Sequence, residues 1–371
     1  MLKFHSLRVL QVSPDAEDAV AIALEVPAAL RAEYHGWPGQ HVVVRASVDG
    51  EDTRRTYSVV SAAGEVALRI VPRVHAHGRM SRYLAEELRV GDFLEVLPPN
   101  GSFTLREGAL PAGATFVAFA AGCGITPVLA IVRALLERGA AHVLVFYGNT
   151  GSSRAMCLEE LLALKDRYLG RLSLHFLMSR EPQEVELYNG RLDAAHVHRL
   201  AAALFRPQAV SAYFICGPGD MIEQVSATLR ELGVEAARLH TEHFTVATAT
   251  PAAEAAAAPG ATAVAAAASA PAPALTAGTA EVTVRMDGRR RTFSMRMDDE
   301  TVLDAAARAG IELPFSCRAG VCSTCRTKVL SGEVQMAQNY ALEDAELEQG
   351  YVLACQSRVR TPILELDYDD R

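Results

Sequence analysis

Four cysteines are spaced in a way that suits a metal cluster. The segment PFSCRAGVCSTC contains Cys317, Cys322 and Cys325 within nine residues of one another. The fourth, Cys355, follows after a gap of 29 residues. A C-x4-C-x2-C pattern with one distant cysteine is the ligand spacing of a [2Fe–2S] cluster, in which four thiolates hold two irons. A structural zinc site more often has two C-x2–4-C halves. The spacing therefore predicts an iron–sulfur cluster rather than zinc or unmodified thiols.

A second candidate site is a glycine turn, AAGCGITP, between a predicted strand and a predicted helix. Gly122 and Gly124 permit a tight turn and the close approach of a phosphate, and the start of the helix offers unpaired N–H groups. We expect Thr126 to cap this helix and Pro127 to occupy its first position. Taken alone, the turn is equally compatible with a plain connection that binds nothing.

Two further turns follow predicted strands in the same region. One is ICGPGDMI, which contains Cys216 and Gly217, and the other is YGNTGSS, which contains Asn149. The carboxyl ends of parallel strands meet at one edge of a sheet, and ligands bind in the crevice there. The three turns together therefore predict one nucleotide-binding crevice.

The elements that must position these residues fall into three folded parts. Residues 1–108 hold short alternating segments separated by Gly, Pro and Asp, which predicts an antiparallel β-barrel. Residues 109–245 alternate strand and helix patterns, which predicts an α/β doubly wound parallel sheet. Residues 281–371 are mixed α+β and resemble a ferredoxin domain of β-grasp type. Residues 246–280 contain 19 Ala and four Pro and are predicted to be a linker.

Composition narrows the range of functions. The net charge of −8 leaves no basic surface of the kind that nucleic acids need, so we expect no nucleic-acid partner. No secretory signal opens the chain, and the apolar run FVAFAAGCGITPVLAIV is interrupted by glycines and a proline, so we expect no membrane span. The seven cysteines then indicate a reducing cytoplasm with metal or catalytic thiols rather than disulfides.

Residues 1–244 resemble the ferredoxin–NADP reductase superfamily, in which a flavin-binding barrel precedes a nucleotide domain. The motifs RTYS and HGRMS carry the resemblance, in order and ahead of G-x-G-x-T-P and C-G-P. The resemblance implies FAD, with Arg55 on the pyrophosphate, Tyr57 against the ring or ribityl chain, and Ser58 near flavin N5. It further implies that six more residues help to bind FAD: Val71, Arg73, Gly78, Arg79, Met80 and Ser81.

The same resemblance places the nicotinamide near Thr126, Cys216 and Gly217, with Met221 beside it. We expect Ser58, Thr126 and Cys216 to stand at the hydride-transfer site. We also expect Gly122, Gly124 and Pro127 to bind the nucleotide, and the resemblance assigns Asn149 to the adenosine end. Arg154 is equally a partner for a 2′-phosphate or a solvated residue, so NADPH is expected and NADH is the alternative.

A barrel, a nucleotide domain and a C-terminal ferredoxin, in this order, resemble the reductase subunits of bacterial multicomponent oxygenases. The resemblance implies that electrons pass from NAD(P)H through FAD and the [2Fe–2S] cluster to a separate oxygenase component, expected to be a di-iron protein. Two alternatives are the reductase of another aromatic-ring oxygenase and a stand-alone NAD(P)H:acceptor reductase. Residues 281–371 contain 16 acidic and 12 basic residues, so one hypothesis is that this part docks on basic patches.

Overall fold

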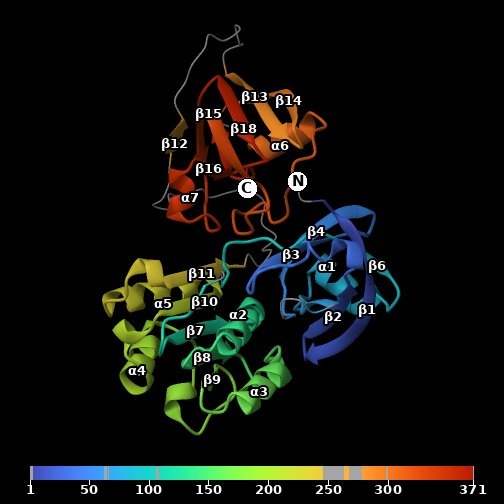
Figure 1. Ribbon diagram of the computed structural model, residues 1–371. Coiled ribbons are helices and arrows are strands. Elements are labelled where there is room, and N and C mark those ends of the chain that lie inside the picture. The colour runs from blue at the N-terminus through green and yellow to red at the C-terminus, as the bar shows by residue number, and fades with distance from the viewer. Residues whose placement is uncertain are drawn as a thin grey trace. The chain divides into compact units, whose positions relative to one another are not determined.

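The computed structural model describes residues 3–61, 65, 67–105, 108–244, 278–297 and 300–370, together with the backbone of residues 263–266. The chain forms two compact units, one from Phe4 to Phe244 and one made mainly of the residues after Phe244. The first unit contains both the predicted flavin barrel and the predicted nucleotide domain (Figure 1).

The barrel is a six-stranded antiparallel sheet with the strand order β4-β3-β6-β1-β2-β5. An isolated bridge between Val59, just after β4, and Ile70 in β5 joins the two ends of this sheet. The prediction of an antiparallel barrel is therefore confirmed. The strands are β1 (His5–Ala16), β2 (Ala19–Glu25), β3 (His41–Val48), β4 (Glu51–Ser58), β5 (Ala67–Ile70) and β6 (Phe93–Val96).

One short helical segment packs against the core of the barrel. It consists of α1 (Arg79–Arg82) and a π-helical turn, η2 (Tyr83–Glu87). Met80 and Leu84 point from this segment into the barrel core and are almost fully buried. The segment thereby fixes the position of the HGRMS loop relative to the strands.

The nucleotide domain is a five-stranded parallel sheet with the order β11-β10-β7-β8-β9. Along β7, Phe116, Ala118 and Ala120 face one hydrophobic core, and Val117 and Phe119 face the other. This two-residue alternation is what a strand buried on both faces requires. The strands are β7 (Thr115–Ala121), β8 (His142–Asn149), β9 (Leu172–Met178), β10 (Ala212–Gly217) and β11 (Leu239–His243).

Helices cover both faces of this sheet, which confirms the predicted doubly wound architecture. Residues of α2 and α3 belong to one core cluster, and residues of α4 and α5 belong to the other. The helices are α2 (Ile125–Glu137), α3 (Leu158–Arg167), α4 (Ala194–Leu204) and α5 (Gly219–Glu231).

The predicted start of the first of these helices is wrong. A 3₁₀ turn, η3 (Gly122–Gly124), runs directly into α2, so Thr126 and Pro127 already lie inside the helix. The Thr126 hydroxyl donates a hydrogen bond to the Cys123 carbonyl oxygen at 2.9 Å instead of capping an N–H group. The two flexible glycines allow the chain to begin winding before the proline.

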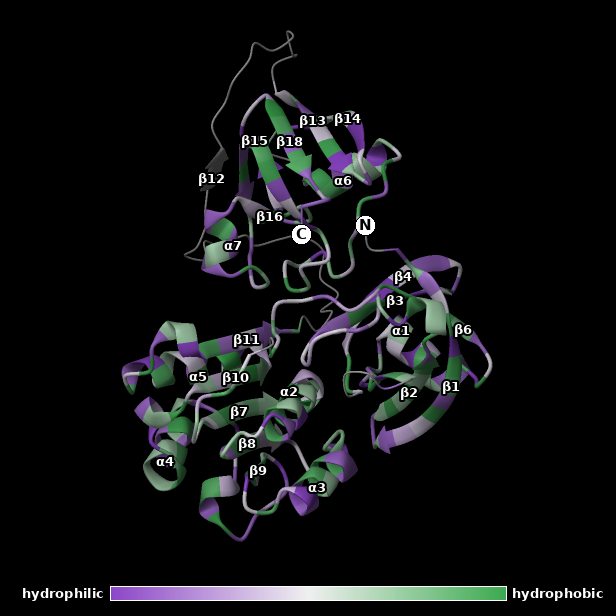
Figure 2. Ribbon diagram, in the orientation of Figure 1, coloured by the Kyte–Doolittle hydropathy of each residue, from purple (hydrophilic) through white to green (hydrophobic). Residues whose placement is uncertain are grey.

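The C-terminal unit is a mixed sheet with the order β12-β15-β18-β13-β14, and β16 and β17 also pair with β15. β13 and β18 are parallel, and α6 packs on β14 and β17, as in the predicted β-grasp type. Figure 2 shows hydrophobic and hydrophilic residues alternating along these strands. The elements are β13 (Thr279–Met286), β14 (Arg289–Arg296), α6 (Val302–Arg308), β15 (Arg326–Met336), α7 (Asp344–Glu348), β16 (Tyr351–Leu353), β17 (Ser357–Val359) and β18 (Ile363–Asp367).

The predicted linker, residues 246–280, lies largely outside the described residues. Within it, β12 (Ala263–Ala266) pairs antiparallel with the Gly332–Gln335 part of β15. The first strand of the C-terminal unit starts at Thr279, two residues before the predicted boundary. The boundaries of the linker therefore remain a prediction, with one short strand inside it.

Candidate functional site

The RTYS motif forms the end of β4. Arg55 is exposed there, Tyr57 is half-buried and Ser58 is buried. The Ser58 hydroxyl is enclosed and has no hydrogen-bond partner among the described residues. A buried hydroxyl without a partner costs free energy, so this position suits a ligand atom that can bond to it. The Arg55 guanidinium donates to the Arg54 carbonyl oxygen at 2.7 Å and stays accessible.

The HGRMS loop is held closed by its own hydrogen bonds. The Ser81 hydroxyl accepts a bond from the His75 N–H and donates one to the Gly78 carbonyl oxygen, both at 3.1 Å. A Cβ atom at Gly78 would lie only 2.4 Å from the Ser81 Oγ, so a larger residue there would push the Ser81 hydroxyl out of these two hydrogen bonds. The backbone is thus compact enough for a phosphate to approach closely.

Arg79 is paired with exposed acidic residues of the same domain. Its guanidinium pairs with Glu51 and with Asp49, and it donates to the Val48 carbonyl oxygen at 2.6 Å. Asp49 lies in the turn between β3 and β4, and Glu51 is the first residue of β4. A diphosphate bound to Arg79 would have to compete with two carboxylates, which weakens the role predicted for this arginine.

Val71 and Arg73 follow β5 and face different surroundings. Val71 is buried in the hydrophobic core. The Arg73 guanidinium donates to the Arg154 carbonyl oxygen at 2.7 Å, and its Nε lies 3.5 Å from the Asp18 carboxylate. Asp18 also pairs with the Arg154 guanidinium. Asp18 therefore neutralises Arg154, which was the predicted candidate for a 2′-phosphate. Arg154 instead joins the nucleotide domain to the barrel.

The two glycine turns of the nucleotide domain touch each other. A Cβ atom at Gly124 would lie 2.0 Å from the carbonyl oxygen of Cys216, so only glycine permits this backbone contact. Met221, in the first turn of α5, packs against Gly217. The structure thus brings Thr126, Cys216 and Met221 to one end of the sheet, as predicted.

Cys216 is fully buried in this position. Burial raises the pKa of its thiol, and the nearby carboxyl of Glu242 raises it further. The thiol therefore stays neutral, so it adds no negative charge beside the predicted nicotinamide position.

Asn149 ends β8 and is nine-tenths buried, with both atoms of its side-chain amide lacking a partner of hydrogen-bond geometry. The loop after it is held by Glu181, whose carboxylate accepts bonds from the Ser152 N–H at 2.7 Å and from its hydroxyl at 2.8 Å. Next to Glu181, the exposed Arg180 donates its backbone N–H to the Thr150 carbonyl oxygen at 3.0 Å. No sequence motif pointed to Arg180, although it follows a predicted strand.

A buried histidine–carboxylate pair lies at the junction of the barrel and the nucleotide domain. The His41 Nδ1 is 3.4 Å from the Glu242 carboxylate, and the two side chains are 3% and 8% exposed. His41 is opposite Ser58 in the β3–β4 ladder, and Glu242 is opposite Cys216 in the β10–β11 ladder. Burial raises the pKa of Glu242, and His41 partly counteracts this rise. Sequence patterns gave no signal for the pair.

The four predicted cluster ligands gather in the C-terminal unit. Cys322, Cys325 and Cys355 are buried, and Cys317 is half-buried. Hydrogen bonds from the Cys322 and Cys355 thiols lower the pKa of Cys317, so both thiols lie close to the Cys317 sulfur. The Ala319 N–H also donates to the Cys317 sulfur at 3.3 Å.

The geometry of the cysteine loop suits a two-iron cluster. A structural zinc ion would take all four thiolates on one metal. A [2Fe–2S] cluster instead takes its four thiolates over two irons. Arg318 and Ser323 have left-handed φ angles of 54° and 48°, a costly conformation for residues other than glycine. A loop that wraps a cluster offers a reason for this cost.

Three family models match the chain in the predicted order. They are an oxidoreductase FAD-binding domain over residues 12–105, an oxidoreductase NAD-binding domain over residues 119–227, and a 2Fe-2S iron-sulfur cluster binding domain over residues 284–360. The fold and the site therefore define an NAD(P)H-dependent oxidoreductase that uses FAD and a [2Fe–2S] cluster. Within the described residues, no helix is both long and apolar enough to cross a membrane.

Relatives that match nearly the whole length of the chain narrow this class. The chain is 38% identical to a component of the 1,2-phenylacetyl-CoA epoxidase of Escherichia coli (strain K12), over 100% of this chain and 99% of that protein. It is 31% identical to the ferredoxin reductase component of 3-ketosteroid-9-alpha-monooxygenase of Rhodococcus rhodochrous, over 98% and 96%. The chain belongs to the family of flavin and iron–sulfur reductase components of oxygenases.

Solved structures share the fold. Phthalate dioxygenase reductase superposes with a TM-score of 0.57 at 22% identity, covering 98% of each chain. An intact type IV self-sufficient cytochrome P450 monooxygenase superposes with a TM-score of 0.67 at 21% identity, covering 98% of this chain and 41% of that one. The two solved structures therefore share the fold of this chain over 98% of its length.

Proposed function

We propose that the chain is the reductase component of a phenylacetyl-CoA epoxidase and supplies electrons to the oxygenase component of that system. The observation that carries this proposal is the 38% identity to the Escherichia coli epoxidase component over the full length of both chains. A second candidate function is the reductase of another oxygenase, which the 31% identity to the 3-ketosteroid monooxygenase component favours.

In this role the bound cofactors supply the redox chemistry: a flavin takes up an electron pair from a pyridine nucleotide and passes electrons singly to an iron–sulfur cluster. The chain's own residues bind and orient these groups. We assign Ser58 to a hydrogen bond with the flavin ring, because its buried hydroxyl lacks a partner among the described residues. Arg55 is accessible for the pyrophosphate. The remaining proposed contacts with FAD are Tyr57, Val71, Arg73, Gly78, Arg79, Met80 and Ser81.

The nicotinamide end is assigned to the crevice at Thr126, Cys216, Gly217 and Met221. The contact between Gly124 and the Cys216 carbonyl supports this assignment, because it closes the floor of the crevice with backbone rather than side chains. A neutral, buried thiol at Cys216 keeps charge and water away from the transferred hydride. We assign the amide of Asn149 to the adenosine end, because its buried polar atoms make no hydrogen bond of good geometry to the described residues, although the Tyr147 hydroxyl lies close by.

NADPH is the nucleotide that we propose, with Arg180 as the cation for its 2′-phosphate. Arg154 is engaged by Asp18, whereas Arg180 is exposed and has no acidic partner within the described ranges. A guanidinium is well suited to a phosphate because it donates in a fixed fork. Arg180→Ala should raise the KM for NADPH about tenfold and leave the KM for NADH unchanged. An equal rise in the KM for NADPH and in the KM for NADH would contradict this role of Arg180.

We assign Cys317, Cys322, Cys325 and Cys355 as the ligands of the [2Fe–2S] cluster, from which single electrons pass to the oxygenase. A chain with seven cysteines and a thiolate-ligated cluster fits a reducing cytoplasm, which is the compartment we propose.

Reconstitution with purified oxygenase components tests the proposed function. The chain, loaded with FAD and iron–sulfur cluster, is mixed with the oxygenase component of a phenylacetyl-CoA epoxidase and, separately, with that of a 3-ketosteroid monooxygenase. We expect NADPH-dependent epoxidation of phenylacetyl-CoA in the first mixture. Turnover in the second mixture alone would favour the second candidate function, and flavin reduction without turnover in either mixture would favour a stand-alone reductase.

A further inference from the structure

Four buried side chains form a row across the junction of the flavin barrel and the nucleotide domain. Ser58 and His41 are directly opposite each other in the β3–β4 ladder, and Cys216 and Glu242 are directly opposite each other in the β10–β11 ladder. Side chains of opposite residues in neighbouring strands point to the same face of a sheet. The His41 Nδ1 lies 3.4 Å from a carboxyl oxygen of Glu242, and this contact joins the two ladders. The row therefore connects the hydroxyl assigned to the flavin ring with the thiol assigned to the nicotinamide.

The His41 ring is held in place from the barrel side. The His41 N–H donates to the Asn100 carbonyl oxygen at 3.0 Å, and the His41 carbonyl oxygen accepts a bond from the Asn100 N–H at 2.9 Å. The ring lies against Gly101, where a Cβ atom would come within 2.9 Å of ring atoms. Gly101 has a φ of 114°, in the left-handed region that favours glycine, so the flat surface under the ring depends on this residue. The imidazole therefore has little room to move away from Glu242.

Apolar contacts beside the pair hold the barrel against the nucleotide domain. A Cβ atom at Gly39, on the barrel, would lie 2.8 Å from the Cδ1 atom of Ile131 on α2. The Phe103 ring, which follows the barrel, meets the Phe214 ring of β10 edge-on, with the ring centroids 5.9 Å apart. Burial of apolar surface supplies most of the adhesion between packed elements. The polar pair is therefore not needed merely to keep the two domains together.

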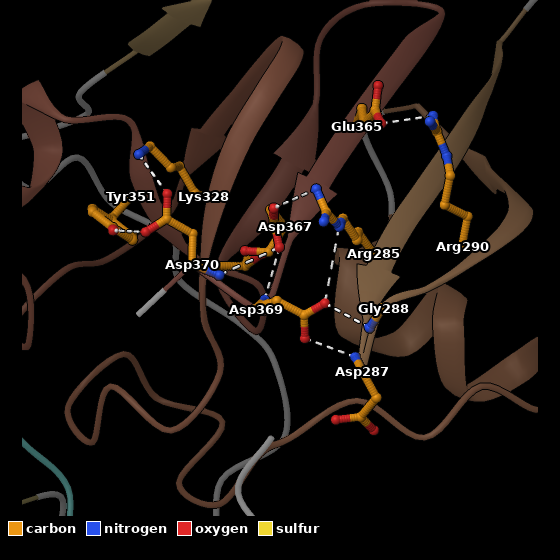
Figure 3. A network of polar contacts seen from close by, with 11 residues as sticks. Arg285, Asp287, Gly288, Arg290, Lys328, Tyr351, Glu365, Asp367, Asp369 and Asp370 are labelled. Atoms are coloured by element: carbon orange, nitrogen blue, oxygen red, sulfur yellow. Dashed lines mark hydrogen bonds and ion pairs between the residues drawn. The ribbon is translucent and has the colours of Figure 1, made fainter.

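Ion pairs that tie parts of the fold together are more exposed in this chain. In the network of Figure 3, Asp370 of the C-terminal tail pairs with Lys328 at 2.6 Å, and their side chains are 42% and 31% exposed. Asp369 of the same tail accepts bonds at 2.7 Å and 2.8 Å from two backbone N–H groups in the turn between β13 and β14. The side chains of His41 and Glu242 are only 3% and 8% exposed. Burying such a pair costs free energy, and an apolar pair of similar volume is often as stable or more stable.

We propose that His41 is a positioning residue for hydride transfer from the nicotinamide to the flavin, acting through Glu242. In this step the nucleotide loses two electrons and the flavin gains them. The inference rests on the proposed function, because it uses the places assigned there to Ser58 and Cys216. A polar contact depends on direction, whereas apolar surfaces slide over each other more easily. The pair therefore holds the strand of the flavin site in one register with the strand of the nicotinamide site.

Anaerobic stopped-flow reduction of the FAD-loaded full chain by NADPH tests the proposal. It separates the rate constant of flavin reduction at saturating NADPH from the Kd for NADPH. A displacement of about 1 Å between reacting groups slows a reaction by up to about a hundredfold. We expect His41→Leu to lower the rate constant about tenfold and to leave the Kd within about twofold of the wild-type value.

Two further variants serve as controls for this experiment. His41→Asn brings a side-chain amide to the position of Nδ1, so it should restore the rate constant to within about threefold of wild type. His5→Leu removes a histidine whose Nε2 lies 3.1 Å from the Glu33 carboxylate, entirely within the barrel. It should leave both the rate constant and the Kd within about twofold of wild type. A wild-type rate constant for His41→Leu, or a defect that lies only in the Kd, would overturn the proposal.

Replacing the whole pair by apolar residues separates positioning from stability. The double variant His41→Leu, Glu242→Leu should unfold at a temperature no lower than that of the FAD-loaded wild-type chain, because two leucines need no polar partner. Its flavin should nevertheless be reduced about tenfold more slowly at saturating NADPH. Reduction of this double variant at the wild-type rate would overturn the proposal, since any close packing of the junction would then be sufficient.

A spectroscopic measurement examines the same geometry without turnover. The flavin is reduced chemically and NADP⁺ is added, and the long-wavelength absorbance of the nicotinamide stacked on the flavin ring is recorded. We expect His41→Leu to lose at least about half of this absorbance at saturating NADP⁺, because stacking depends on the offset and separation of the rings. An unchanged band would overturn the inference. No oxygenase is present, so a wild-type chain that NADPH does not reduce would contradict the proposed function, whereas wild-type behaviour of His41→Leu would overturn this inference alone.

Discussion

Glu160 joins the flavin barrel to the nucleotide domain through two arginines. Its carboxylate, on α3, lies 2.6 Å from Arg69 of β5 and 2.8 Å from Arg133 of α2. Arg133 also donates to the Val60 carbonyl oxygen at 2.7 Å, at the end of the flavin-binding strand. We predict that Glu160→Gln loosens this junction, because it removes the charge that both guanidinium groups share.

The magnitude follows from the burial of the partners. The Arg133 side chain is 14% exposed and the Arg69 side chain 32%. A charge-assisted hydrogen bond contributes about 1.5–3 kcal/mol when it is well buried, and an exposed ion pair contributes about 0–1 kcal/mol. Taking the low end of the first range for Arg133 and about half a kcal/mol for Arg69 gives a loss of about 2 kcal/mol. In a unit of this size, that loss lowers the Tm by about 4–8 °C.

The assay is thermal unfolding of the FAD-loaded chain. The unfolding is monitored by calorimetry and by the fluorescence of the flavin that is released. Glu159→Gln is the matched control, because Glu159 precedes Glu160 on the same helix and is exposed. A Tm for Glu160→Gln within about 1 °C of the control would refute the reasoning, since the two ion pairs would then contribute nothing measurable.

Three further predictions test separate parts of the structure. Gly124→Ala should raise the KM for NADPH at least tenfold in steady-state assays, because a Cβ atom would lie 2.0 Å from the Cys216 carbonyl oxygen; an unchanged KM would contradict this close contact. Burial raises the pKa of Glu242 above its usual 4.5, so ionising this carboxyl costs stability as the pH rises above that value; in urea unfolding, Glu242→Gln should gain stability relative to wild type as the pH is raised above about 4.5, and a difference that does not change with pH would contradict the argument. Asp369→Ala should lower the unfolding temperature of the C-terminal unit, because two backbone N–H groups lose their acceptor, whereas an unchanged temperature would show that the tail does not stabilise the sheet.

Local patterns were sufficient to predict the architecture. The alternation along β7 and the glycine turns at the strand ends are short-range features, so the parallel sheet and its crevice follow from the sequence. The cysteine spacing is equally local, and it predicts the ligand set without knowledge of the fold. The predicted start of α2 was wrong by two residues, because the conformation of a single turn there depends on small energy differences that the local pattern does not record.

Contacts between distant segments could not be predicted in this way. His41 and Glu242 meet because a barrel strand and the last strand of the nucleotide sheet are packed together, and no pattern in either segment records that meeting. Arg154 has the right chemistry for a phosphate, but Asp18 in a barrel loop engages it. Arg180 becomes a candidate in its place only when the partners of both arginines are known.

Anaerobic reduction of the cofactor-loaded chain by NADPH tests the central claim most directly, namely that electrons leave through the cluster held by Cys355 and its three partners. Absorbance follows the flavin, and electron paramagnetic resonance follows the cluster. We predict that the wild-type chain bleaches its flavin and then develops the signal of a reduced [2Fe–2S] cluster, whereas Cys355→Ser bleaches its flavin at the same rate without that signal. A wild-type chain whose flavin is reduced while the cluster stays oxidised would contradict the account.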